Sequence, residues 1–312
     1  MGKADVATRS YMADPQRFAD AFNYAIYDGE EVITPDALKP LDSVSLEPGT
    51  GSGRKSERRR DGLKLWQAMG DGQVAYALLG VEDQTVIHYG MPVRCMTYDA
   101  LAYHDQIKDL TRKHRAQAGA TGAEWLSGIC KEDRLLPVVT LVLHFGSERW
   151  DGPMGLHDML TPMDKPLAAL VPDYRINLLS PACMADESFA KFRTELGIVL
   201  GYIKYAQDKD GLERYIRSES RFRNVGAESV ELINTLTDSR LKVVEGEETV
   251  DMCKAIEDMR AEARNEGIEQ GIEQGAMQVL SGLVRDGVLT LKDAAARAGV
   301  APEEFRKRAA ML

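Results

Sequence analysis

Two acidic residues, Asp61 and Glu82, lie at the ends of segments that otherwise have the composition of β-strands. In the second segment, residues 74–84, side chains alternate between faces, so Glu82 and Gln84 share a face with apolar residues such as Leu78. A carboxylate at the end of an apolar strand costs free energy unless a cation or hydrogen bonds satisfy it. Acids on two neighbouring strands can jointly hold a hard divalent ion, Mg²⁺ or Mn²⁺, which would activate water and stabilise charge on a phosphoryl group.

The spacing of these acids also allows an ordinary structural interpretation. An aspartate and a glutamate separated by a strand and a turn occur in many soluble proteins. In that case Asp61 pairs with a nearby arginine, and Glu82 with Asp83 begins a solvated turn.

Further sequence blocks accompany the two acids along residues 14–210. These blocks are Phe22-Asn23-Tyr24 with Asp28-Gly29-Glu30, Tyr89-Gly90-Met91-Pro92-Val93-Arg94, Leu141-Val142-Leu143-His144-Phe145-Gly146, and Trp150-Asp151-Gly152-Pro153 with Leu156-His157-Asp158-Met159-Leu160. Together with Asp61 and residues 81–84, they resemble the PD-(D/E)XK nuclease superfamily and, within it, the Rpn family of recombination-promoting nucleases, often labelled as transposases. The resemblance implies an α/β, restriction-endonuclease-like core, a mixed central sheet flanked by helices. It also implies metal-dependent hydrolysis of DNA phosphodiester bonds, linked to recombination or mobile elements.

The resemblance implies that Asp61 and Glu82 hold the metal, with Mg²⁺ or Mn²⁺ as cofactor. Gln84 stands where the superfamily motif has lysine. The family that the chain resembles shows the same substitution of lysine by glutamine. A glutamine amide can orient a water molecule but supplies no positive charge, so the general base stays undefined. In the superfamily the first helix often brings an acidic residue towards the metal. Asp20 or Asn23 is the candidate here, and an ordinary surface aspartate is the alternative.

Basic residues gather near the acids, although the net charge of −10 argues against broad attraction to nucleic acid. Arg58, Arg60 and Lys64 are candidate DNA contacts beside Asp61. Arg94, one turn into the helix expected after the metal strand, is a candidate phosphate contact, with a structural salt bridge as the alternative. A second basic cluster spans residues 108–115, and both clusters are equally compatible with ordinary solvated charges.

The bulk composition predicts one large domain with an appendage. The chain has 312 residues, of which 44% are hydrophobic, enough for a substantial core. The four scattered cysteines form no Cys-x-x-Cys pair, so the sequence predicts no structural zinc site and favours a reduced, cytoplasmic setting. Neither a signal peptide nor an apolar run of membrane-spanning length is apparent, so no membrane contact is expected.

The elements that must position the acids follow from local patterns. Asp14 and Pro15 predict a helix start, with Phe18, Phe22 and Ile26 as its buried stripe. The two motif strands are expected to be joined by a turn at residues 70–72. Further predictions are a short helical segment at 33–38, strands at 43–46, 135–145 and 174–179, a helix at 91–110 with Val93, Met96, Ala100, Leu101 and His104 on its inner face, an amphipathic helix at 189–207, and helices continuing to about 242.

The C-terminal part reads as a separate piece, giving a nuclease-like domain over 1–242 and a charged helical tail over 243–312. The sequence Gly-Ile-Glu-Gln occurs at 267–270 and again at 271–274, which places both isoleucines near one stripe of a helix. Each glycine costs roughly 1 kcal/mol relative to alanine, so such a helix needs a partner. The pattern predicts a tether or a self-association element, through which the chain could form a homo-oligomer. Residues 290–305 resemble a helix-turn-helix with Gly299 at the turn, a pattern that bundles without DNA also show. Two rival functions therefore remain, a catalytically silent DNA-binding module and an interaction protein that assembles through this helix.

Overall fold

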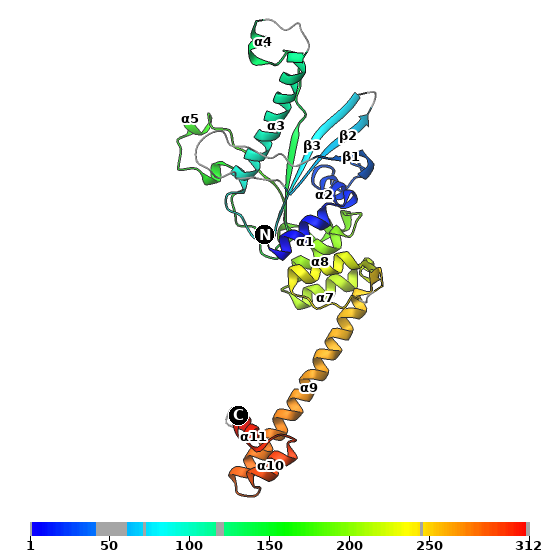
Figure 1. The fold of residues 1–312 in the computed structure, drawn as a ribbon, viewed down its shortest axis with the longest axis vertical. Coiled ribbons are helices and arrows are strands. Elements are labelled where there is room, and N and C mark those ends of the chain that lie inside the picture. Colours follow the sequence, from blue (N-terminus) through cyan, green and yellow to red (C-terminus); the bar gives the residue numbers. More distant parts are fainter. Residues whose placement is uncertain (1, 42–60, 71–72, 117–121, 244–245, 310–312) are drawn as a thin grey trace. The chain divides into compact units, whose positions relative to one another are not determined.

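The computed structural model describes residues 2–41, 61–70, 73–116, 122–243 and 246–309, and the chain divides into two compact units, Met1–Met252 and Cys253–Leu312 (Figure 1). The boundary lies at Met252, whereas the sequence pattern placed it at 242. The first unit is α/β, with a mixed sheet flanked by helices, and the second is helical, as predicted.

The first unit contains a five-stranded sheet in the order β1-β2-β3-β4-β5, made of β1 Leu38–Pro40, β2 Gly62–Gly70, β3 Gln73–Gln84, β4 Val138–His144 and β5 Asn177–Leu179. Strands β1, β2 and β3 are antiparallel neighbours, while β4 runs parallel to both β3 and β5. The two motif strands are therefore paired, as predicted, and β5 is the expected edge strand. The strand predicted at 43–46 and most of the turn at 70–72 fall outside the described residues.

Helix α2, Pro15–Tyr27, begins where the sequence predicts, after the shorter helix α1, Lys3–Met12. The Asp14 carboxylate accepts hydrogen bonds from the backbone N–H groups of Gln16 and Arg17, at 2.8 and 3.0 Å, which caps the helix. Phe18 and Phe22 are buried, but Ile26 is 43% exposed, so the buried stripe ends a turn earlier than expected.

Helix α3, Met91–Ala116, follows β3 and is longer than predicted. Its buried face is formed by Cys95, Tyr98, Asp99 and Ala102, whereas the predicted face included Val93, which is 40% exposed. Apolar patterning misses this face because it carries an aspartate. Thr140 and Tyr174 satisfy the Asp99 carboxylate, the latter at 2.5 Å.

The remaining helical elements of the first unit are η1 Pro35–Ala37, α4 Ala123–Ser127, η2 His157–Met159, α5 Lys165–Ala168, η3 Pro181–Cys183, η4 Asp186–Lys191, α6 Leu196–Tyr205, α7 Lys209–Ser218, η5 Ser220–Arg223 and α8 Ala227–Thr237, with a small sheet of β6 Val225–Gly226 and β7 Thr249–Val250. The single amphipathic helix predicted at 189–207 is wrong. The chain breaks between η4 and α6, and residues 196–203 of α6 are all buried. The cause of the break lies partly in α2, because the Asp20 carboxylate accepts the backbone N–H groups of Arg193 and Thr194, at 3.0 and 2.8 Å.

The second unit contains α9 Met252–Arg285, α10 Leu291–Arg297 and α11 Pro302–Ala309. Met277, Ala294, Ala295 and Phe305 form its small core. Gly299 has a φ of +69°, which suits the predicted turn between α10 and α11. Within the described part of the chain, every helix is too short or too polar to cross a bilayer.

Candidate active site

The predicted acids meet at the C-terminal end of β3. The antiparallel register pairs Gly62 with Val81, so Asp61, which directly precedes β2, lies beside Glu82 and Asp83. The backbone N–H of Asp83 donates a hydrogen bond of 3.1 Å to Asp61 Oδ2. The fold therefore brings together the acids that the sequence singled out, through strand pairing alone.

Glu82 is fully buried, and its carboxylate faces α3. Arg94, in the first turn of α3, places its Nη2 3.0 Å from Glu82 Oε2. The side chain of Glu82 is 0% exposed and that of Arg94 is 29% exposed, so this ion pair has one buried and one half-buried partner. Burial lowers the pKa of the Arg94 guanidinium, but the neighbouring Glu82 carboxylate and Tyr98 outweigh it, and the net pKa is raised. Of the two roles foreseen for Arg94, the structure shows the salt bridge.

Asp61 is paired with an arginine of α1. Its Oδ1 accepts a hydrogen bond from Arg9 Nη2, and the Asp61 side chain is only 8% exposed. A second contact holds α1 against the end of β3, since Thr85 Oγ1 donates to Asp5 Oδ1 at 2.9 Å. Asp61 thus pairs with an arginine, but with one from the N-terminal helix, 52 residues earlier, and not with a nearby arginine as the structural alternative expected.

Asp83 is a third acidic side chain beside Asp61 and Glu82. It is buried, and its Oδ1 has no hydrogen-bond partner among the residues that the structure describes. Burial raises the pKa of its carboxyl well above the ordinary value, Asp61 and Glu82 raise it further, and only Arg9 acts in the opposite direction. The alternative that Glu82 and Asp83 begin a solvated turn is wrong, because both side chains are buried.

Gln84 is also buried, and its Nε2 donates a hydrogen bond of 2.9 Å to the carbonyl oxygen of Asp83. Its register partner on β4 is His144, whose Nδ1 lies 3.1 Å from Ser180 Oγ. Burial lowers the pKa of the His144 imidazole, which favours its neutral form. The polar layer at this end of the sheet thus extends from Asp61 to His144.

The donor set fits a hard divalent cation, since it offers carboxylate oxygens and one carboxylate atom with no described partner. Among the described residues, however, one trio of metal-binding side chains brings its ligand atoms within 4.8 Å of one another, and that trio is His114, Cys130 and Asp133. The carboxylate oxygens of the three acids at the end of β3 are not all within that distance of one another, and Arg9 and Arg94 pair with two of these acids as countercharges. A cation bound there would take over charge that the two arginines now balance.

Comparison with protein-family models, with curated proteins and with solved structures found no match for this chain. The family resemblance therefore rests on the sequence blocks alone.

The two accessory candidates on α2 do not reach the acids. Asp20 is 4% exposed, not on the surface, and accepts hydrogen bonds from the backbone before α6 and from Thr194 Oγ1 at 2.6 Å. Asn23 is buried as well, donating to Ile33 O and accepting from Ile33 N, each at 2.8 Å. Both side chains are used to fix loops against α2.

Of the three candidate DNA contacts, the structure describes Lys64 alone. Arg58 and Arg60 lie outside the described residues. Lys64 is 8% exposed, and its Nζ donates to Ala13 O at 2.9 Å and lies 4.4 Å from the centre of the Phe18 ring. Burial lowers the pKa of its ammonium group. Lys64 therefore joins the β-sheet to the segment between α1 and α2, and little of its side chain is exposed.

The structure also reveals a cluster that the sequence pattern did not predict, formed by His114, Cys130 and Asp133. The signal was a histidine in the last turn of a long helix, followed 16 residues later by a cysteine and then by an aspartate three residues beyond it. A search for paired cysteines overlooks such a group.

Proposed function

We propose that the chain is a metal-dependent DNA endonuclease with a restriction-endonuclease-like core. The observation that supports this most directly is that strand pairing places the buried carboxylates of Asp61 and Glu82 beside each other at one end of β3, next to the buried carboxyl of Asp83. Buried carboxylates of like charge are costly unless a cation is part of the design, so the cluster is better explained by a metal site than by stability. The mixed five-stranded sheet flanked by helices agrees with the fold that the sequence resemblance implies.

In this proposal Asp61 and Glu82 hold Mg²⁺ or Mn²⁺. The bound ion supplies Lewis-acid stabilisation of the phosphoryl oxygens and a more acidic water molecule. Gln84 orients the attacking water through its amide, and Arg94 keeps the Glu82 carboxylate in position. Attack of the water oxygen on phosphorus breaks one P–O ester bond, leaving a phosphate monoester and a free hydroxyl group.

The test is nicking of supercoiled plasmid in Mg²⁺ and in Mn²⁺. We expect Asp61→Asn and Glu82→Gln each to lower the nicking rate by a factor on the order of 100 or more, because each removes charge that the ion needs. Asp109→Asn is a matched control, since Asp109 is an exposed acid of α3 that pairs with Arg112 at 2.9 Å. Unchanged nicking in both site variants, with folding verified by circular dichroism, would reject the proposal.

A catalytically silent DNA-binding module is the rival outcome of the same experiment. It would bind DNA with an affinity that falls steeply with salt, without metal-dependent cleavage. In that case Asp61→Asn and Glu82→Gln would leave nicking at background, as in the wild type.

A second proposal concerns α9, which we infer to associate with a second copy of the chain. Ile268, Ile272 and Val279 are 50%, 68% and 64% exposed, and their spacing of four and seven residues places them near one stripe of the helix. We expect light scattering to show a dimer or larger species for the wild type and a monomer for Ile272→Glu. Val86→Glu is the matched control, because Val86 is 72% exposed in the first unit. A monomeric wild type would contradict this proposal and leave the nuclease proposal untouched.

A further inference from the structure

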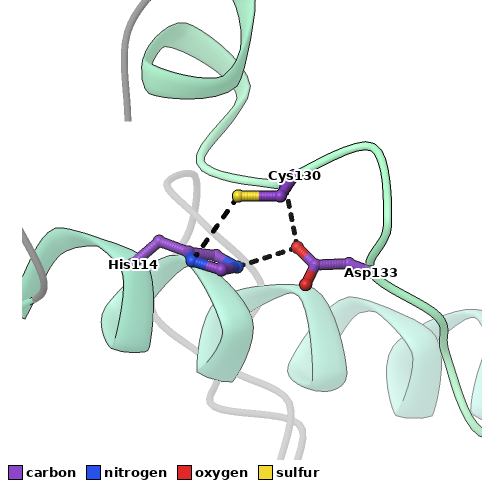
Figure 2. A group of neighbouring side chains, drawn as sticks. All are labelled: His114, Cys130 and Asp133. Atoms are coloured by element: carbon purple, nitrogen blue, oxygen red, sulfur yellow. Dashed lines mark hydrogen bonds and ion pairs between the residues drawn. The ribbon is translucent and has the colours of Figure 1, made fainter. Parts of the chain in front are cut away.

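A second polar cluster lies where α3 ends and the segment leading to β4 returns to it (Figure 2). His114 comes from the last turn of α3, and Cys130 and Asp133 come from the loop that follows α4. His114 Nε2 lies 2.8 Å from Asp133 Oδ2, and Cys130 Sγ lies 3.6 Å from His114 Nδ1. Three side chains from two separate segments therefore converge on one point.

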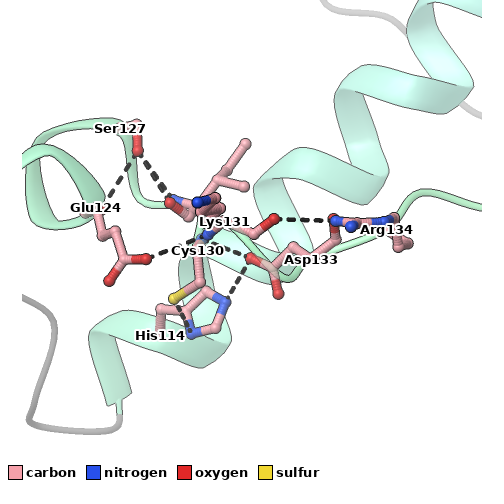
Figure 3. A network of polar contacts seen from close by, with 8 residues as sticks. His114, Glu124, Ser127, Cys130, Lys131, Asp133 and Arg134 are labelled. Carbon is pink, nitrogen blue, oxygen red and sulfur yellow. Dashed lines mark hydrogen bonds and ion pairs between the residues drawn. The ribbon is translucent and has the colours of Figure 1, made fainter.

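Backbone hydrogen bonds fix this loop independently of any ligand (Figure 3). The N–H of Cys130 donates to Asp133 Oδ2 at 2.7 Å, and the N–H of Lys131 donates to Glu124 Oε1 at 3.2 Å. Arg134 Nη1 donates to the carbonyl oxygen of Lys131 at 2.9 Å. Because the loop is held on both sides of Cys130, the thiol and the imidazole face each other before anything binds.

The geometry selects one histidine tautomer and two ligand atoms. When His114 Nε2–H donates to Asp133, the lone pair of Nδ1 faces the sulfur of Cys130. Zinc bonds of about 2.0–2.1 Å to nitrogen and about 2.3 Å to sulfur, at a tetrahedral angle, place the two ligand atoms roughly 3.6 Å apart. The observed separation of Nδ1 and Sγ is 3.6 Å. A carboxylate on the other ring nitrogen is the usual device that orients a metal-binding histidine.

We propose that His114 and Cys130 bind Zn²⁺, or a divalent ion of similar softness, and that Asp133 orients the imidazole. Thiolate and imidazole ligands select such ions over Mg²⁺ and Ca²⁺. The carboxylates of Asp133 and Glu124 lie beside Cys130 and accept hydrogen bonds from the backbone around it, so the surroundings favour a cation. Water completes the coordination, which makes the site accessible to chelators and reversible.

The experiment is a Co²⁺ titration of the full chain after treatment with a chelator, followed by displacement with Zn²⁺. Cobalt is the probe because a thiolate ligand gives a charge-transfer absorption band that oxygen ligands do not give. We expect one equivalent of Co²⁺ to produce this band and one equivalent of Zn²⁺ to remove it. Cys130→Ser should abolish the band, His114→Gln should weaken binding at least tenfold, and Asp133→Asn should weaken it by about 10–100-fold.

Two matched controls separate this site from other ligands in the chain. Cys183→Ser removes an exposed cysteine elsewhere and should leave the band and the affinity unchanged. Glu82→Gln alters the proposed catalytic site and should also leave the thiolate band unchanged, so the two proposals can fail separately. Absence of the band in the wild type, or its persistence in Cys130→Ser with the fold verified by circular dichroism, would overturn the assignment.

Discussion

Asp61, Glu82 and Asp83 stand at the end of paired strands and are closed off from solvent, whereas His114, Cys130 and Asp133 stand at a helix end and in a loop, partly open to it. The first cluster consists of three acidic side chains, two of which pair with arginines. The second consists of complementary groups already joined by hydrogen bonds. One region therefore carries an electrostatic cost in the absence of a ligand, and the other is satisfied without one.

The two regions should therefore respond differently to a bound cation. In the buried cluster a hard ion would replace arginine charge and relieve repulsion, so binding and stability are coupled there. In the half-exposed cluster a soft ion would replace a thiol proton on a loop that is already ordered, so the loop keeps its structure when no ion is bound. Mutations that remove a partner should accordingly be costly in the first region and mild in the second.

The largest effect is expected from Arg94→Met. It removes the cation beside Glu82 while keeping an apolar side chain on α3, and it leaves a fully buried carboxylate without that countercharge. Removing one partner of a buried pair costs roughly 3–5 kcal/mol, and we expect about 3 kcal/mol because Arg94 is partly exposed. Urea unfolding in chelator measures the loss. Added Mn²⁺ should raise the free energy of unfolding of the variant more than that of the wild type, because the ion replaces the charge that the variant lacks.

Arg112→Met provides the matched control on the same helix. Arg112 and its partner Asp109 are 78% and 63% exposed, so the loss of this pair should change the free energy of unfolding by less than about 0.5 kcal/mol. If both substitutions changed the free energy of unfolding equally, the burial of the Glu82 carboxylate would not require its ion pair with Arg94. The contrast between a buried and an exposed cluster would then lose its basis.

The sequence predicted the parts of this architecture that depend on local patterns. The start of α2, the pairing of the motif strands and the proximity of Asp61 to Glu82 follow from a cap, an alternation and a turn. The arginine on Asp61 did not follow, because it lies on α1, 52 residues earlier in the chain. Such a contact depends on how α1 packs against the end of β3, which no local pattern encodes.

Buried polar residues explain most of the remaining differences. Asp20 and Asp99 are hydrophilic by type and buried in fact, because backbone N–H groups and hydroxyl groups satisfy their carboxylates. Because helix faces are assigned by hydrophobicity, the predicted inner face of α3 is displaced from the observed one, and Asp20 of α2 is expected on the surface. The cluster at Cys130 was missed for a related reason, since its three residues become neighbours only when the chain folds back on α3.

A smaller effect is expected from His144, which marks the β4 side of the buried region. Burial lowers the pKa of its imidazole below the ordinary value of about 6.5, so the folded state binds fewer protons than the unfolded state near that pH. Stability linked to His144 is therefore present above about pH 6.5 and declines as the pH falls below it. We expect the urea midpoint to fall between pH 7.5 and 5.5 more in the wild type than in His144→Gln.

The difference between wild type and variant isolates the histidine, because the carboxyl of Asp83 titrates in both proteins and with the opposite sign. Its raised pKa means that the folded state loses stability as the pH rises through that pKa. His104→Gln, a substitution at an exposed position of α3, should leave the wild-type dependence in place. Identical pH dependence in wild type and His144→Gln would show that the imidazole is not held neutral by burial.

The smallest effect is expected in the half-exposed cluster, where Asp133→Asn should speed alkylation of Cys130 several-fold in chelator. Burial raises the pKa of the Cys130 thiol, and Glu124 and Asp133 raise it further, so removing one carboxylate increases the fraction of thiolate at pH 8. Peptide mass spectrometry after brief iodoacetamide treatment measures the rate at this cysteine alone, with Asp109→Asn as control. A slower or unchanged rate would mean that Asp133 acts on the thiol through loop geometry and not through charge. The geometry of the loop would then depend on Asp133, much as the buried cluster depends on its arginines, and the two regions would differ less in their response to a lost partner.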